Sequence, residues 1–229
     1  MSNTVDIVAS IVELIPRTIT VNEIQNSGTK VITCDTLYAT ELKTVEDSQG
    51  NKYSITGFVA NEYLEISPVG GAPEFTDTVL ILPKPLFIHG TPLSTNNEYL
   101  KINSRQSKKT PFIWLLESFE EEIPGGDSAL EFSVRVRLFF MDGAIQAKIN
   151  AEQHRLYIKP MTRLAKLFKE VVENEYHFRN IEGSLIRPRA RFGVEVTNQG
   201  NKRKIFDDGL SGVEALLLLE VLDIQSCLC

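Results

Sequence analysis

A stretch of strict two-residue alternation in the second half of the chain constrains the fold most. From Leu130 to Met141, apolar side chains occupy every second position. The positions between them begin with four polar residues, Glu131, Ser133, Arg135 and Arg137. Successive side chains of a β-strand point to opposite faces of a sheet. This stretch therefore predicts a strand with one apolar and one polar face.

A helix and three further strands are predicted around it. Residues 160–175 carry an apolar stripe at helical spacing, and Pro160 suits the first turn of a helix. Phe112 to Leu116 is a continuous apolar run, typical of a buried strand. Leu185 to Val196 alternates, and its proline indicates an edge position or a bulge. Val213 to Leu222 is apolar on both faces apart from two glutamates, as in a central or doubly covered strand. The predicted order is strand, strand, helix, strand, strand.

In the first part of the chain, the spacing of apolar residues predicts one helix followed by short strands. Residues 4–15 predict a helix that Thr4 caps and Pro16 ends. Five or six short strands follow between residues 17 and 83, separated by turn signals such as Asn26-Ser27-Gly28 and Asp47 to Asn51. Prolines then mark a linker around Leu86 to His89, and a short helix is predicted near residues 94–104.

These elements predict the α+β class: a mixed or antiparallel sheet with packed helices, plus a small inserted all-β unit, barrel- or sandwich-like. The expected units are residues 1–16, a helix packing on the core; 17–83, the β unit; 84–109, a linker with a short helix; and 110–229, the α+β core.

Charge and cysteine content limit the function classes. The net charge is −6, from 24 basic and 30 acidic residues, which disfavours nucleic-acid binding through bulk charge. We expect neither a secretory signal nor a membrane span. Three cysteines, Cys34, Cys227 and Cys229, indicate a reducing cytoplasm without a disulfide framework. Cys227 and Cys229 supply at most half of a closed zinc site, so a packed or frayed tail is favoured.

Sequence motifs give no support for catalysis, so we predict no enzyme activity, no cofactor and no metal. Nucleophile-elbow, P-loop, dinucleotide-binding and zinc-protease patterns are absent from the sequence. His154 is interpreted as a solvated residue at a helix start, and His89 as a core histidine with its hydrogen bonds satisfied. The acidic pair Asp207-Asp208 is interpreted as part of a solvated loop.

Two charged segments are the candidate contact sites. Arg187, Arg189 and Arg191 project from one side of one predicted strand, and Glu120, Glu121 and Glu122 lie in a predicted acidic loop. One interpretation is a solvent-facing strand whose charges discourage aggregation. A second is a surface for an acidic partner, including the glutamates of a neighbouring copy. A third is nucleic-acid contact, although no aromatic residues interleave the arginines.

Several segments together resemble a known group of proteins. They are 87–92, 109–117, 136–142, 157–161, 191–194 and 200–214. They include Phe-Ile-His-Gly-Thr-Pro from Phe87 and Phe-Asp-Asp-Gly-Leu-Ser-Gly from Phe206. Over nearly its whole length, the chain resembles proteins encoded in tailed bacteriophages and prophages of the Bacteroidetes lineage. Its order of elements is similar to that of phage neck proteins of the tail-terminator, tail-completion or head–tail connector type.

The resemblance implies a structural virion protein, made in the bacterial cytoplasm, that forms a ring at the top of the tail. Such rings are often sixfold, contact portal-adaptor, neck or tail-tube proteins, and let genomic DNA pass without sequence-specific binding. The resemblance implies no catalytic residues. Two alternatives stay open. One is another assembly component, such as a baseplate adaptor or a tail assembly chaperone. The other is a protein that binds a small ligand.

Overall fold

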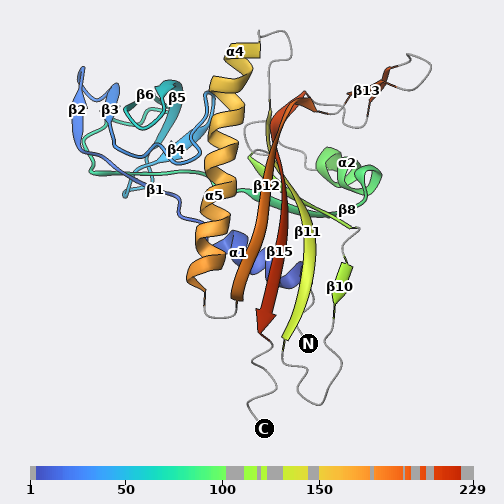
Figure 1. The fold of residues 1–229 in the computed structure, drawn as a ribbon. Coiled ribbons are helices and arrows are strands. Elements are labelled where there is room, and N and C mark those ends of the chain that lie inside the picture. Colours follow the sequence, from blue (N-terminus) through green and yellow to red (C-terminus); the bar gives the residue numbers. More distant parts are fainter. Residues whose placement is uncertain are drawn as a thin grey trace.

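Two sheets and one long helix organise the molecule, as Figure 1 shows for the computed structural model. The structure describes residues 4–101, 111–117, 120–122, 131–143, 150–175, 178–192, 194–196, 202–204 and 209–222. Helices pack on a mixed sheet, and a second, all-β sheet is formed by the first third of the chain. The predicted α+β class is therefore confirmed.

The main sheet has the strand order β12-β15-β11-β9-β8, and β10 pairs with β11 beside this path. Its strands are β8 (Leu86–Gly90), β9 (Phe112–Leu116), β10 (Glu120–Glu122), β11 (Glu131–Gly143), β12 (Phe178–Phe192) and β15 (Leu210–Leu222). Only β8 and β9 are parallel. The prediction of a central strand at β15 and an edge strand at β12 is confirmed.

Two assignments near this sheet need correction. Leu86 to His89 lies in the stretch predicted as a linker, but it forms β8 because its backbone pairs with β9 and Leu86 N–H donates to the Pro111 carbonyl at 2.9 Å. The predicted strand over Leu185 to Val196 is instead two strands, β12 and β13 (Val194–Val196). β13 pairs with β14 (Lys202–Lys204).

The long helix begins ten residues before the predicted start. It runs through α4 (Asn150–Gln153), a π-helical segment η1 (His154–Ile158) and α5 (Lys159–Asn174). Pro160 lies inside this helix and lacks the N–H group that an α-helical bond to residue 156 requires. The π-helical turn before it accommodates the proline, so the helix continues instead of starting there.

The two faces of the main sheet pack against different helices. Val134, Val136, Leu138 and Phe140 of β11 are buried on the face that α5 and α1 (Thr4–Leu14) cover. Phe139 and Trp114 stack on the opposite face with their ring centroids 4.6 Å apart. That face carries a smaller cluster, which includes Tyr99 of α2 (Pro92–Lys101). The alternation predicted for β11 is therefore confirmed, but the end of the strand is covered on both faces.

The β unit is a seven-stranded antiparallel sheet with the order β1-β7-β4-β5-β6-β3-β2. Its strands are β1 (Thr18–Thr20), β2 (Glu23–Gln25), β3 (Lys30–Ile32), β4 (Thr44–Glu46), β5 (Lys52–Val59), β6 (Tyr63–Pro68) and β7 (Val79–Ile81). Among the described strands, this path is open and forms no closed barrel. At the predicted turn before β3, Asn26, Ser27 and Gly28 all have positive φ.

The two sheets share one hydrophobic core. Buried side chains of the β unit, such as Val31, Tyr53 and Leu64, belong to the same contiguous cluster as Leu138 and Phe168 of the main sheet and α5. Burial of apolar surface of this kind supplies about 25 cal/mol per Å². The β unit is therefore attached to the rest of the molecule through a continuous apolar core as well as through the chain.

Candidate functional site

The predicted arginine strand is the edge strand β12. Arg187 is exposed, and Arg189 is half-buried. Arg191 also lies in β12, but the placement of its side chain is outside the described part of the structure. Arg187 lies opposite Glu214 of β15 in the strand register. These arginines therefore line one long edge of the main sheet.

Glu214 explains part of this arginine pattern, and the sequence analysis did not identify it. Its side chain is 1% exposed. Arg137 Nε donates to its Oε1 at 2.6 Å, and Arg189 Nε donates to its Oε2 at 2.6 Å. Arg137 also lies over the ring of Phe139, 5.2 Å from the centroid. Arg137 and Arg189 therefore hold a buried carboxylate inside the chain, which leaves Arg187 as the exposed arginine whose side chain is described on this edge.

The buried carboxylate has a shifted pKa. Burial raises the pKa of Glu214, but the hydrogen bonds and charges of Arg137 and Arg189 outweigh burial and bring it below the ordinary value. In an unfolded chain the pKa of glutamate is about 4.3. The ionised carboxylate therefore stabilises the fold above that pH, and this contribution is lost as the pH falls through the lower folded-state pKa.

We expect Glu214→Gln to lower the free energy of unfolding by about 1–2 kcal/mol at neutral pH, because solvent partly screens the two guanidinium groups. The difference from the unchanged protein should narrow as the pH is lowered from about 5 toward 3. Urea unfolding at a series of pH values measures it. Glu46→Gln is the matched control, since Glu46 is 48% exposed and lies 3.5 Å from Lys52. If Glu214→Gln lowers the free energy of unfolding by the same amount at every pH, the lowered pKa of Glu214 is contradicted.

The predicted acidic loop is partly a strand. Glu120, Glu121 and Glu122 form β10, which pairs with β11 so that Glu120 lies opposite Arg135. Pairing with β11 extends this segment, which is why it is not a free loop. β10 lies on the side of β11 away from β15 and β12. The structure therefore does not bring the glutamates and the β12 arginines together within one chain.

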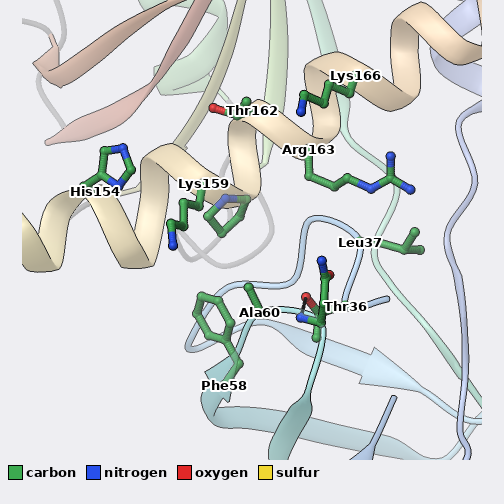
Figure 2. Close-up of a pocket in the computed structure, with 11 residues that line it drawn as sticks. Thr36, Leu37, Phe58, Ala60, His154, Lys159, Thr162, Arg163 and Lys166 are labelled. Atoms are coloured by element: carbon green, nitrogen blue, oxygen red, sulfur yellow. Dashed lines mark hydrogen bonds between the residues drawn. The ribbon is translucent and has the colours of Figure 1, made fainter. Parts of the chain in front are cut away.

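A groove between the long helix and the β unit is a second candidate site, which the sequence analysis missed (Figure 2). Its volume is about 450 Å³, within the range of ligand-binding clefts. The helix contributes His154, Lys159, Pro160, Thr162, Arg163 and Lys166, and the β unit contributes Thr36, Leu37, Phe58, Ala60 and Asn61. Among these described lining residues there are four basic side chains and no carboxylate.

A π-helical turn lies at the groove end of the long helix. Lys159 N–H donates to the His154 carbonyl, a bond that closes a five-residue turn. Lys159 and Lys166 are seven positions apart, about two α-helical turns, so they lie on the same side of α5. His154 was predicted at a helix start; it is exposed as expected, but it lies within the helix and lines the groove.

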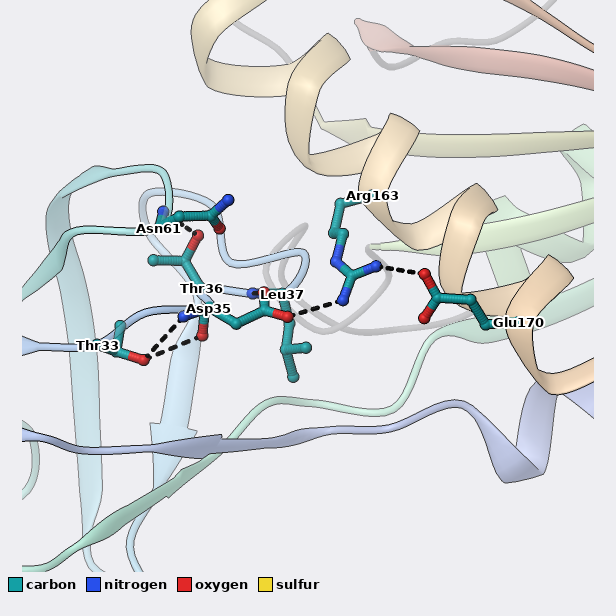
Figure 3. Close-up of polar contacts among 7 residues, drawn as sticks. All are labelled: Thr33, Asp35, Thr36, Leu37, Asn61, Arg163 and Glu170. Atoms are coloured by element: carbon teal, nitrogen blue, oxygen red, sulfur yellow. Dashed lines mark hydrogen bonds and ion pairs between the residues drawn. The ribbon is translucent and has the colours of Figure 1, made fainter. Parts of the chain in front are cut away.

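Arg163 joins the two sides of the groove (Figure 3). Its Nη2 donates to Asp35 Oδ2 of the β unit at 2.7 Å, and its Nη1 donates to Glu170 Oε1 at 2.7 Å. Asp35 also accepts the Leu37 N–H at 2.7 Å through Oδ1. The charge of Arg163 is therefore balanced within the chain. This network fixes the position of the loop that carries Thr36 and Leu37.

A buried ion pair forms a second link between the β unit and the main sheet. Lys43 Nζ lies 2.6 Å from Asp142 Oδ1, and their side chains are 6% and 2% exposed. Thr40 Oγ1 donates to Asp142 Oδ2 at 2.5 Å, and Gly143 N–H donates to Oδ1 at 2.7 Å. Asp142, near the end of β11, is therefore held in a polar cluster to which the β unit contributes Thr40 and Lys43.

The remaining candidate residues carry no assigned chemistry. Cys34 is exposed, whereas Cys227, Cys229 and the Asp207-Asp208 pair lie outside the described residues. In the described part of the chain, no three His, Cys, Asp or Glu side chains are grouped as a metal site would require. The described helices include none long and apolar enough to cross a membrane.

Comparison with known proteins gives no assignment. No protein-family model, curated protein or solved structure matches the chain.

Proposed function

We propose that this chain is a structural protein of a tailed-phage virion that assembles head to tail into a ring at the junction of head and tail. The observation that supports the proposal is the chemistry of two strands of the main sheet, the edge strand β12 and the short strand β10, which pairs with β11 beside the main strand order. β12, with Arg187, Arg189 and Arg191, forms one edge, and β10, with three consecutive glutamates, lies on the other side of β11.

A head-to-tail contact needs two different, complementary patches on each copy. β12 presents 15 residues along an edge of the sheet, and an unpaired strand edge is a ready site for another chain. Opposite charge on β12 and β10 favours contact between these unlike strands of two copies over contact between like strands. The resemblance to phage neck proteins supports the same arrangement, since such rings close through repeated unlike contacts.

The role of Arg189 within the chain decides which variant tests the contact. Arg189 holds the buried Glu214, so a charge reversal at Arg189 would damage the fold as well as any contact. The informative variant is Arg187→Glu with Arg191→Glu, which leaves Arg189 in place. Arg17→Glu with Lys101→Glu makes the same change in net charge at exposed positions outside the sheet edge.

We expect the unchanged protein to form a discrete large species as its concentration rises, and the Arg187/Arg191 variant to remain at the 25.7 kDa monomer mass. Light scattering coupled to size-exclusion chromatography measures the mass, and negative-stain images show whether the species is a closed ring. The Arg17/Lys101 control should assemble normally. A protein that stays monomeric at all concentrations and is missing from purified virions would overturn the proposal.

A further inference from the structure

The groove between α5 and the β unit holds two lysines whose charge is not balanced within the described structure. Lys159 and Lys166 are exposed and line the groove, and no described carboxylate pairs with either. Arg163 lies between them but is neutralised by Asp35 and Glu170. The groove therefore presents a net positive surface on a chain whose total charge is −6.

The spacing of the basic side chains indicates an elongated ligand. At 1.5 Å per residue, Lys159 and Lys166 are about 10 Å apart along the helix, and His154 extends the row to about 18 Å. A ligand that pairs each lysine with a carboxylate of its own must therefore extend along the helix. An extended peptide rises about 3.3 Å per residue, so five or six residues cover the row.

The other lining residues indicate a peptide rather than a nucleic acid. Leu37, Phe58 and Pro160 are buried and give the groove an apolar floor, and the exposed Asn61 supplies an amide at its rim. Single-stranded nucleic acids bind through aromatic stacking. Phe58 is the one Phe, Tyr or Trp residue among the described lining residues, so the groove offers no row of such rings for successive bases.

The β side of the groove is held in an unusual backbone conformation. Leu37 and Asn61 both have positive φ, 48° and 61°. A leucine in this region is strained, so the surrounding contacts must enforce its conformation. Asp35 holds the Leu37 N–H, and Thr36 Oγ1 accepts the Asn61 N–H at 3.2 Å (Figure 3). The two corners are therefore fixed before any ligand arrives, which reduces the entropy cost of binding.

We propose that this groove binds an extended acidic segment of a partner protein. Its carboxylates pair with Lys159 and Lys166, and an apolar side chain of the segment packs against Leu37 and Phe58. Figure 2 shows these residues on the two sides of the groove. The site is separate from both edges of the main sheet, so this proposal goes beyond ring assembly and does not depend on it.

Fluorescence anisotropy with a labelled peptide tests the proposal. The probe is a peptide of about seven residues in which glutamate alternates with leucine, and the same peptide with lysine in place of glutamate is the comparison. We expect the acidic peptide to bind and the basic peptide not to bind. Lys159→Glu with Lys166→Glu should weaken binding of the acidic peptide at least tenfold. Lys159→Gln with Lys166→Gln should weaken it less, because it removes charge without reversing it.

Two controls make the result decisive. Lys52→Glu with Lys101→Glu changes the net charge equally at exposed positions outside the groove and should leave peptide affinity within about twofold of the unchanged protein. A thymidine oligonucleotide of the same length tests the alternative ligand. Tighter binding of the oligonucleotide than of the acidic peptide would overturn the proposal. Equal loss of peptide affinity in the groove and control variants would also overturn it. Every binding measurement can be made on monomeric protein. A failure of peptide binding is therefore distinguishable from a failure of ring assembly.

Discussion

Asp142→Ala is expected to lower the free energy of unfolding by about 3–5 kcal/mol, a large part of the 5–15 kcal/mol of a typical domain. The change leaves the Lys43 ammonium group buried without its carboxylate, and it also removes the acceptor of the Thr40 hydroxyl. A buried charge that loses its partner keeps the cost of leaving water and loses the attraction that offset it. Urea unfolding, with the midpoint and slope fitted together, measures the effect.

The variants around Asp142 separate pairing from packing. Glu74→Ala, at an exposed position, should change the free energy of unfolding by no more than about 0.5 kcal/mol. Lys43→Met with Asp142→Leu replaces the pair with apolar side chains of similar size, and should recover most of the loss. If the single Asp142→Ala change costs less than about 1 kcal/mol, the pair does not hold the β unit on the main sheet in the way its burial indicates.

The elements that could be predicted from the sequence are those with a regular spacing of apolar residues. β11 and α1 follow regular patterns that one face of a strand or helix requires, and both lie close to their predicted bounds. β15 was predicted as central because both of its faces are apolar, and it does lie between β11 and β12. In these elements, the pattern that marks the buried face lies within the sequence of the element itself.

Two predictions were wrong because the same local sequence signal fits two different structures. Proline is common at the first turn of a helix, so Pro160 was interpreted as a start. The residues before it, Leu156, Tyr157 and Ile158, are buried, and that apolar run was the available signal that the helix continues through a π-helical turn. Leu86 to His89 is short and flanked by prolines. Its role as β8 depends on a parallel partner that lies over twenty residues later in the sequence.

The candidate sites depend on contacts that no local pattern contains. Glu214 is an acidic residue in an apolar strand, and only the register of β11, β15 and β12 shows that Arg137 and Arg189 reach it. The groove combines residues 36–61 with residues 154–166, almost a hundred positions apart. Three-dimensional placement was required to bring either set together.

Phe168→Ala is the second large effect we expect, a loss of about 3–5 kcal/mol in the free energy of unfolding. Phe168 is fully buried where α5 meets the main sheet, and its ring packs edge-to-face on Phe140 with centroids 5.7 Å apart. Removing the ring loses its transfer free energy and leaves a cavity that a sheet and a long helix cannot close. Phe168→Leu keeps most of the volume and should cost less than half as much.

The Phe168 variants also test how the groove is supported. Lys166 lies on α5 two positions before Phe168, and the helix positions it relative to the β unit. Phe168→Ala should therefore weaken binding of the acidic peptide, because α5 loses its packing contact with Phe140. The charge of the groove is unchanged in this variant. Lys169→Ala, a change at a partly exposed residue in the next position, should leave both stability and peptide affinity nearly unchanged. Equal effects of Phe168→Ala and Lys169→Ala on unfolding would contradict the central packing role of Phe168, since only one of the two side chains belongs to the shared core.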